Sequence, residues 1–429
     1  MDQITTTIKK EVAKNRQYLI DLISKLVQFG SYSGESEEIQ LYIREIMAGL
    51  ALETELVKVK PEKLSRYKGF SDDGYPYERR YSLMGTLRAG KSGSANPGHS
   101  LILNGHVDIV PPGDLSLWTE DPLSGCCRDN KIFGRGSLDM KGGLSAAITA
   151  VKVLRNLGFV NYGDLILTSV CGEETGGCGA FALIDTGLTA NGCIILEPTK
   201  LNICPVQSGC HTFKITVKGR SIHACMAYRG INVVDKFYLI YKALKEMDLY
   251  RHARYNNSLY ENPANVAPFS VGSVEAGEWP SSVPDRLETH GRMGIFPGET
   301  VEEMHREFEE TVQKAAAGDP WLKDHPPLVE WYEGLFEPAD TPSDSEFVST
   351  LADCHIQALK RKARFEAVTY GSDLRIFRLY GGIPTVLYGP GDVTRAHTVN
   401  EYITVDEVME AVVSIALMIV RWCGGKINV

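Results

Sequence analysis

The sequence predicts an α/β protein with a central mixed sheet flanked by helices and an α+β domain inserted into it. Three short apolar stretches, each followed by an acidic residue or a histidine, alternate with helical patterns, which is typical of βαβ units. From about residue 207 the pattern changes to the apolar–polar alternation of half-exposed antiparallel strands. Because 429 residues exceed one ordinary core, we expect two domains. Residues 1–207 and 336–429 form the first domain, and residues 208–335 form the second.

The N-terminal part of the first domain is predicted to be mainly helical. Apolar residues recur at helical spacing through residues 2–29, and the Gly- and Ser-rich residues 30–34 end that pattern. A second helix is expected at residues 35–50, and strands at residues 54–59 and 81–87. Two further segments have no predicted role: the polar, tyrosine-rich residues 61–80 and the Gly/Ser/Asn/Pro loop at residues 89–99.

The stretch from residue 101 to residue 143 organises the first domain. An apolar strand begins at Leu101, and His106 and Asp108 follow on one face, because alternate side chains of an extended chain share a face. Asp139 stands in a glycine-flanked turn before a helix expected at residues 144–157. A carboxylate between strand and helix lies where open α/β sheets bind their ligands.

Two more apolar strands end in acidic residues. The strand at residues 165–171 precedes Glu173 and Glu174, and the strand at residues 193–196 precedes Glu197. The inserted domain is expected to contain strands at residues 211–218, 268–274, 286–295 and 328–332 and helices at residues 232–247 and 300–315. The first domain then resumes with helices at residues 345–359 and 405–423 and a strand near residues 366–370.

Composition excludes several classes of protein. The chain is 43% hydrophobic and 23% charged, with a mild net charge of -9 and dispersed basic residues, so nucleic acid is not an expected partner. No apolar run approaches membrane-spanning length, and the first residues lack the apolar core of a signal peptide. Ten cysteines without a CxxC pair are typical of reduced thiols. We therefore expect a cytoplasmic protein that does not bind membranes.

The residues with metal-binding side chains form one candidate set, and each stands at a predicted strand end or in a loop. They are His106, Asp139, Glu174, Glu197 and His397. Two imidazoles and three carboxylates can supply two tetrahedral sites that share a carboxylate, and these donors suit zinc, with cobalt or manganese as substitutes. Taken alone, the His106–Asp108 pair is also compatible with a structural hydrogen bond. Glu173 is left beside Glu174 and could act as a general base, because consecutive side chains diverge.

Six motifs, in this order and spacing, carry a resemblance to a known family. They are NGHVDIVPPG with Trp118 after it, GRGSLDMKGG, CGEETGG, LEPT, GRSIHA and AHTVNEYI. Together they resemble the M20 metallopeptidases and amidohydrolases over nearly the whole chain. That group includes acetylornithine deacetylase, succinyl-diaminopimelate desuccinylase, aminoacylase and glutamate carboxypeptidase.

The resemblance implies a catalytic domain like that of di-zinc aminopeptidases. In it, His106 and Glu197 bind one zinc, Glu174 and His397 bind the other, and Asp139 bridges them. Asp108 orients His106, and Glu173 is the base. A helix-start acid is the alternative for Glu197.

The resemblance also assigns roles to the inserted domain. It acts as a lid and joins two chains into a homodimer through residues 208–335. His223 reaches the substrate carbonyl of the partner's site, and Arg292 receives a substrate carboxylate. A surface histidine and a salt bridge at the rim are the respective alternatives.

The implied reaction is hydrolysis of an N-acyl amide of a small molecule. The first candidate is a deacylase of N-acyl amino acids of the acetylornithine deacetylase kind. The second is an N-formyl aminopyrimidine deformylase of thiamine salvage, and the third is a metallo-exopeptidase. A binding homologue without activity would lack a ligand or the base, and none is missing from the sequence.

Overall fold

The computed structural model describes residues 2–32, 34–90, 98–332 and 334–427. Most of the polar loop expected at residues 89–99 therefore lies outside the described residues. The chain divides into two compact units. Unit 1 contains residues 1–205, 340–366 and 372–429, and unit 2 contains residues 206–339 and 367–371. Within the described residues, no helix has the length and apolar character needed to span a bilayer.

The main sheet is mixed. Among the described residues it has nine strands, eight of them in the order β1-β2-β7-β3-β8-β16-β9-β14, while β15 pairs with β9. Their bounds, in chain order, are β1 Glu53–Lys58, β2 Tyr81–Leu87, β3 Leu101–His106, β7 Leu165–Val170, β8 Gly192–Ile195, β9 Ile203–Gln207, β14 Ala339–Asp340, β15 Phe365–Val368 and β16 Thr385–Leu387. The central strands β7, β3, β8 and β16 run parallel, whereas β1, β2 and β9 pair antiparallel with their neighbours.

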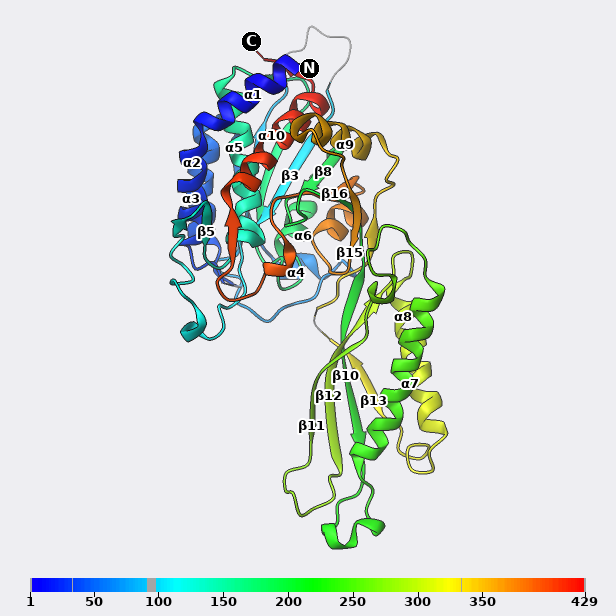
Figure 1. Ribbon diagram of the computed structural model, residues 1–429. Coiled ribbons are helices and arrows are strands. Elements are labelled where there is room, and N and C mark those ends of the chain that lie inside the picture. The colour runs from blue at the N-terminus through cyan, green and yellow to red at the C-terminus, as the bar shows by residue number, and fades with distance from the viewer. Residues whose placement is uncertain (1, 33, 91–97, 333, 428–429) are drawn as a thin grey trace. The chain divides into compact units, whose positions relative to one another are not determined.

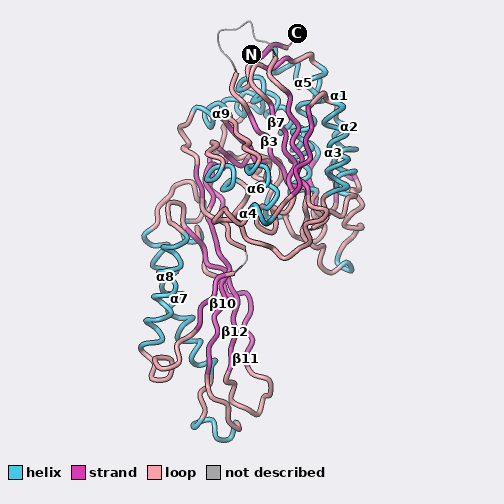
Figure 2. Tube along the Cα trace, turned by 180° about the vertical axis from the view of Figure 1, so that it is seen from behind, coloured by secondary structure: helices cyan, strands magenta, loops and turns pink. Residues whose placement is uncertain are grey.

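Helices cover both faces of this sheet. In Figure 1, α5 and α10 lie in front of the strands, and in the reverse view of Figure 2, α6 lies in front. The helices of unit 1 are α1 Asp2–Lys14, α2 Arg16–Val27, α3 Glu37–Gly49, α4 Pro61–Leu64, α5 Gly142–Asn156, α6 Cys178–Asp185, α9 Glu346–Leu359 and α10 Val405–Trp422. The parallel strands are buried along their whole length, as sheets covered on both faces require. This arrangement confirms the predicted fold class.

The single helix predicted for residues 2–29 is wrong in one respect. It is two helices, α1 and α2, because Asn15 between them leaves the helical conformation with φ -90° and ψ 8°. The side-chain amide of Asn15 donates to the carbonyl of Glu11 at 2.8 Å, which is how asparagine competes with the helical backbone.

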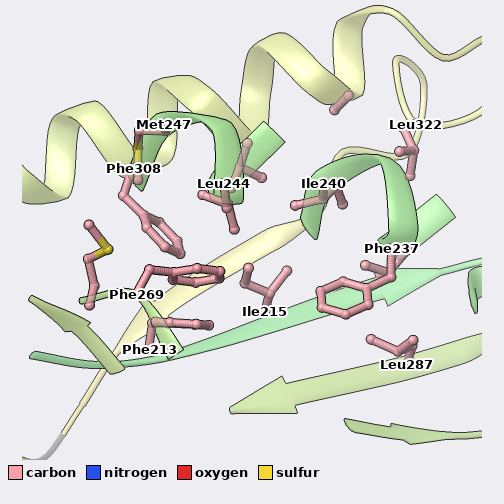
Figure 3. Packing of buried hydrophobic residues seen from close by; sticks show 14 of the residues in the cluster. Phe213, Ile215, Phe237, Ile240, Leu244, Met247, Phe269, Leu287, Phe308 and Leu322 are labelled. Atoms are coloured by element: carbon pink, nitrogen blue, oxygen red, sulfur yellow. The ribbon is translucent and has the colours of Figure 1, made fainter. Parts of the chain in front are cut away.

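Unit 2 is a four-stranded antiparallel sheet packed against two helices. The strand order is β11-β12-β10-β13. The elements are β10 Gly209–Lys218, α7 Val233–Arg254, β11 Ser270–Ala276, β12 Arg286–Ile295, α8 Val301–Ala317 and β13 Leu328–Trp331. Figure 3 shows how Phe213 and Ile215 of β10 pack against Leu244 of α7 and Phe308 of α8. This core belongs to unit 2 alone, so the inserted domain has its own hydrophobic core.

Two small sheets complete unit 1. In one, β17 Tyr402–Thr404 pairs with β5 Lys131–Phe133, which pairs with β4 Cys127–Arg128. In the other, β18 Gly425–Lys426 pairs with β6 Val160–Asn161. The β17–β5 pair brings the C-terminal motif beside the turn that carries Asp139.

Candidate active site

The candidate site lies at the carboxyl edge of the main sheet. The strand β3 ends at His106, and its two neighbours β7 and β8 run parallel to it. The loop after β7 carries Glu173 and Glu174, and Glu197 stands two residues after the end of β8. Because the carboxyl ends of parallel strands meet at the same edge, these side chains come together although they are far apart in the sequence.

Asp139 and His397 reach the same edge from loops. Asp139 lies in the short helical turn Ser137–Lys141, directly before α5. His397 follows β16, which is parallel to β8. The backbone of His397 has φ 61°, in the left-handed region that costs a non-glycine residue about 1–3 kcal/mol. Such a conformation is typical of a functional position that the surrounding structure imposes.

The two histidines and three of the carboxylates form one continuous cluster. The Nε2 atom of His106 lies 3.0 Å from Oδ1 of Asp139 and 3.9 Å from Oε1 of Glu197. The Nε2 atom of His397 lies 3.0 Å from Oε1 of Glu174 and 3.4 Å from Oδ2 of Asp139. Asp139 therefore presents one carboxylate oxygen to each histidine.

The cluster has the donor atoms of a metal centre. Two overlapping groups have ligand atoms within 4.8 Å of one another: His106 with Glu173 and Glu197, and His106 with Asp139 and Glu174. The buried Oε1 atom of Glu197 has no hydrogen-bond partner among the described residues. A buried carboxylate oxygen without a partner is costly unless a cation lies beside it. Imidazole nitrogens and carboxylate oxygens suit zinc, so the residues present fit the predicted metal.

Asp108 supports the cluster in a way that the sequence did not indicate. Its backbone carbonyl lies 3.0 Å from Nδ1 of His106, whereas its carboxylate is 3.7 Å from that atom. Its carboxylate instead accepts hydrogen bonds from the backbone N–H groups of Glu173, at 3.2 Å, and Glu174, at 3.0 Å. With this carbonyl as the acceptor, the proton of His106 is on Nδ1, and Nε2 is left free to bind a metal. Asp108 thus orients both the histidine and the glutamate loop.

A buried ion pair joins the turn of Asp139 to the loop of His397. Arg135 donates to the carboxylate of Glu401 at 2.6 Å, and both side chains are almost completely buried. Glu401 also accepts from the backbone N–H groups of Leu138 and Asp139, and Arg135 donates to the carbonyl of His397 at 3.3 Å. The pair therefore fixes the loops that carry two of the candidate ligands relative to each other.

The carboxylates of the cluster raise one another's pKa. Burial and then the charge of Glu197 raise the pKa of Glu173 well above its ordinary value. Burial and then the charge of Asp139 raise the pKa of Glu197 well above its ordinary value. Hydrogen bonds to Asp139 and Glu174 raise the pKa of His397 to about 10. The site thus favours positive charge at its centre, which bound cations would supply.

A further carboxylate, Asp373, belongs to this surrounding. It is buried, it accepts a hydrogen bond from the amide of Asn104 at 3.4 Å, and its Oδ1 atom has no partner among the described residues. Burial raises the pKa of Asp373 to about 6, and its charge in turn raises the pKa of Glu173.

The sequence reasoning assigned no role to Arg135, Glu401 or Asp373. Arg135 and Glu401 stand inside the motifs GRGSLDMKGG and AHTVNEYI, and Asp373 follows the strand expected near residues 366–370. The only signal in the sequence was a charged residue within or near each motif. Its partner is more than 200 residues away along the chain, so local patterns do not reveal the pair.

The other two candidate residues lie in unit 2. His223 is exposed and precedes the short helical turn Ala224–Arg229, and its Nδ1 atom accepts the backbone N–H of Cys225 at 3.1 Å. A neutral imidazole that accepts at Nδ1 carries its proton on Nε2 and can donate from there. Arg292 is exposed in β12, and among the described residues it forms no ion pair.

Comparison with known proteins identifies the family of this chain. A family model described as peptidase family M20/M25/M40 matches residues 102–421. The chain is similar to an N-formyl-4-amino-5-aminomethyl-2-methylpyrimidine deformylase from Halalkalibacterium halodurans, with 28% identity covering 96% of each chain. It is also similar to an acetylornithine deacetylase from Photorhabdus laumondii, with 28% identity over 76% of this chain and 78% of the relative.

Solved structures show the same fold. A tripeptidase from Staphylococcus aureus superposes with a TM-score of 0.74 at 18% identity and covers 95% of this chain and 99% of its own. At that identity the likeness concerns the fold alone.

The buried Arg135–Glu401 pair yields a stability prediction. Glu401→Ala leaves the guanidinium of Arg135 buried without its carboxylate, which costs about 3–5 kcal/mol of unfolding free energy. Glu410→Ala is the matched control, because it breaks the exposed pair of Arg361 and Glu410 and should change stability little. Urea unfolding of both variants measures the difference. Equal midpoints would contradict a structural role for the buried pair.

Proposed function

Because the chain belongs to peptidase family M20/M25/M40, we propose that it is a two-metal amidohydrolase that removes the formyl group from an N-formyl aminopyrimidine. The reaction class rests on one observation: two imidazoles and three carboxylates meet at the carboxyl edge of the main sheet, with Asp139 facing both histidines. The substrate rests on the deformylase relative, which the chain matches over almost its whole length. That match moves the formylated aminopyrimidine ahead of the N-acyl amino acid, which the motifs alone put first.

Two zinc ions per chain are the proposed cofactor, and cobalt or manganese could substitute. His106 and Glu197 would hold one ion, Glu174 and His397 would hold the other, and Asp139 would contribute one oxygen to each. When bound, such a pair supplies a water of lowered pKa and polarises the substrate carbonyl.

Glu173 is the proposed general base. It is buried beside Glu197 and next to a candidate ligand, yet the structure gives it no ion pair of its own among the described residues. It would accept the proton of the attacking water and then deliver it to the leaving nitrogen as the C–N bond breaks. The products are formate and the free amine. Asp108 holds the backbone of Glu173 in place during both transfers.

We further propose that the enzyme works as a cytoplasmic homodimer. Its ten cysteines are all free, which agrees with a reducing compartment. Helix α7 of unit 2 exposes several large apolar side chains, namely Val234, Tyr238, Leu239, Leu249 and Tyr250. An exposed apolar face of this kind marks an interaction site. In the dimer, the Nε2–H of His223 would donate to the substrate oxygen in the partner's site and stabilise the developing oxyanion.

The roles of the adjacent glutamates can be separated. Glu173→Gln should keep about two metal ions per chain and lose about 10²–10⁴-fold in kcat, because only the proton shuttle is removed. Glu174→Gln should reduce the metal content instead, because it changes a ligand that lies 3.0 Å from His397. Metal analysis and steady-state kinetics on both variants test this. Normal turnover by Glu173→Gln would show that the base is misassigned.

The dimer gives a prediction for His223. A mixture of inactive Glu173→Gln and inactive His223→Ala chains should regain activity, because one site of each heterodimer then has both groups. Activity is measured before and after subunit exchange, which tagged chains can verify. If exchange is complete and no activity returns, His223 does not act in the partner's site.

A second candidate substrate, an N-acyl amino acid, is favoured by Arg292. This exposed guanidinium forms no ion pair among the described residues, and it could hold a carboxylate with two parallel hydrogen bonds. The acetylornithine deacetylase relative supports the same candidate.

One comparison distinguishes the two substrates. Purified, zinc-loaded enzyme is assayed on the formylated aminopyrimidine and on acetyl, formyl and succinyl amino acids, each as the acid and as the neutral amide. For a deformylase, the pyrimidine should be the best substrate, and Arg292→Lys should affect acids and amides equally. For a deacylase, Arg292→Lys should lower kcat/KM for acids about 10–100-fold and leave the amides nearly unchanged. That second outcome would overturn the deformylase proposal.

A further inference from the structure

The tyrosine-rich segment, residues 61–80, connects the outer strands β1 and β2 of the main sheet. The backbone N–H of Val59 donates to the carbonyl of Arg80 at 3.0 Å, which closes the segment at its base. An aromatic cluster holds its middle: Tyr67 and Phe70 pack on Phe181 of α6, and Tyr67 also meets Tyr380 edge-on. The segment is therefore an ordered part of unit 1.

The loop that carries Glu173 and Glu174 is a tight turn, in which the backbone N–H of Gly176 donates to the carbonyl of Glu173 at 3.1 Å and that of Gly177 donates to the carbonyl of Gly172 at 2.6 Å. Gly172, Gly176 and Gly177 all have positive φ, at 70°, 121° and 79°, so the loop is built on residues with the widest conformational freedom. Asp108 holds one side of the loop through the backbone N–H groups of both glutamates. The other side depends on contacts from elsewhere in the chain.

The first such contact runs through Asp73. Arg80, almost fully buried, donates two parallel hydrogen bonds to the carboxylate of Asp73, each of 2.7 Å. The hydroxyl of Thr175, the residue after Glu174, donates to the same carboxylate at 2.5 Å. Arg80 also lies against Gly172, where a Cβ would stand 2.3 Å from its Nη2 atom. The segment thus touches both the beginning and the middle of the loop.

The second contact runs through Arg375, two residues after Asp373. Its buried guanidinium donates to the carbonyl of Gly69 in the segment at 3.1 Å and to the carbonyl of Gly176 in the loop at 2.8 Å. The same guanidinium lies 5.3 Å from the ring centre of Phe181. One rigid, planar cation therefore joins the segment to the end of the loop.

We propose that the tyrosine-rich segment is a positioning element for the glutamate loop. Through Asp73 and Arg375 it holds residues 172–177 in the conformation that aims Glu173 and Glu174 at the cluster. This proposal rests on the proposed function, in which Glu173 is the base and Glu174 a ligand. Asp73, Arg80, Thr175 and Arg375 act through the loop and do not touch the reacting atoms.

Thr175 offers the cleanest test, because Asp73 is already neutralised by Arg80. Removing the hydroxyl leaves no buried charge without a partner, so the variant should fold. Thr175→Val has nearly the same shape and lacks the bond to Asp73, whereas Thr175→Ser keeps a hydroxyl there. Thr186→Val is the matched control, because the hydroxyl of Thr186 donates to the carbonyl of Leu183 at the end of α6, away from the loop.

Hydrogen–deuterium exchange and kinetics on these variants measure the effect. In Thr175→Val, peptides that cover residues 172–178 should exchange about fivefold faster, while peptides of β3 stay unchanged. The kcat should fall about tenfold while KM changes little, because the base is displaced and substrate binding is not. Thr175→Ser should recover most of both losses, and Thr186→Val should match the wild type.

Two results would overturn the proposal. Unchanged exchange in Thr175→Val would show that the segment does not hold the loop. Faster exchange with unchanged kcat would show that it holds the loop without positioning the base. If the wild type hydrolyses none of the amides, the proposed function fails instead, and the exchange measurement still decides whether the segment holds the loop.

Discussion

Several carboxylates gathered at one edge of the main sheet repel one another and call for compensating positive charge. Asp139, Glu173, Glu174, Glu197 and Asp373 lie around one edge of the sheet, and burial or neighbouring charge raises the pKa of four of them. The imidazoles of His106 and His397 lie 3.0 Å from the carboxylates of Asp139 and Glu174, respectively. Proteins concentrate acids in this way only where cations compensate, because a buried charge without a partner costs several kcal/mol. The cluster is therefore unfavourable as a structural feature alone and is explained by metal binding.

Buried arginines pair with two further carboxylates whose loops contact the cluster. Arg135 neutralises Glu401, and Arg80 neutralises Asp73, each with bonds shorter than 3 Å. A guanidinium stays charged when buried and presents its donors in a fixed plane, so it can hold two loops in one geometry. The loops that bear the ligands are thus set by ion pairs rather than by regular secondary structure.

Unit 2 is stabilised mainly by apolar packing. Its core consists of aromatic and aliphatic side chains between one sheet and two helices, and no candidate metal ligand lies in it. Helix α8 begins with a reciprocal cap between Thr300 and Glu303, a local signal of a helix that forms independently of distant charges. His223 and Arg292 both belong to this unit.

The family, the mixed α/β fold and the residue types of the cluster could be predicted from the order of residues alone. These follow from local patterns: apolar strands that end in acids or histidine, and motifs in a fixed order. Membership of the predicted family is confirmed by the match over residues 102–421. The assignment of each ligand and of the base remains a prediction, which the distances among His106, Asp139 and His397 support.

The groups that hold these residues in place could not be predicted in this way and are seen in the folded chain. The backbone carbonyl of Asp108 lies beside Nδ1 of His106, whereas its carboxylate accepts hydrogen bonds from the backbone N–H groups of Glu173 and Glu174. Asp73 meets Thr175, and Arg375 links Gly69 to Gly176, across separations of a hundred residues or more. Periodicity and motif spacing report on neighbours within a few turns of chain. Which buried charge meets which partner depends on how strands are ordered in the sheet, and that order is a property of the whole fold.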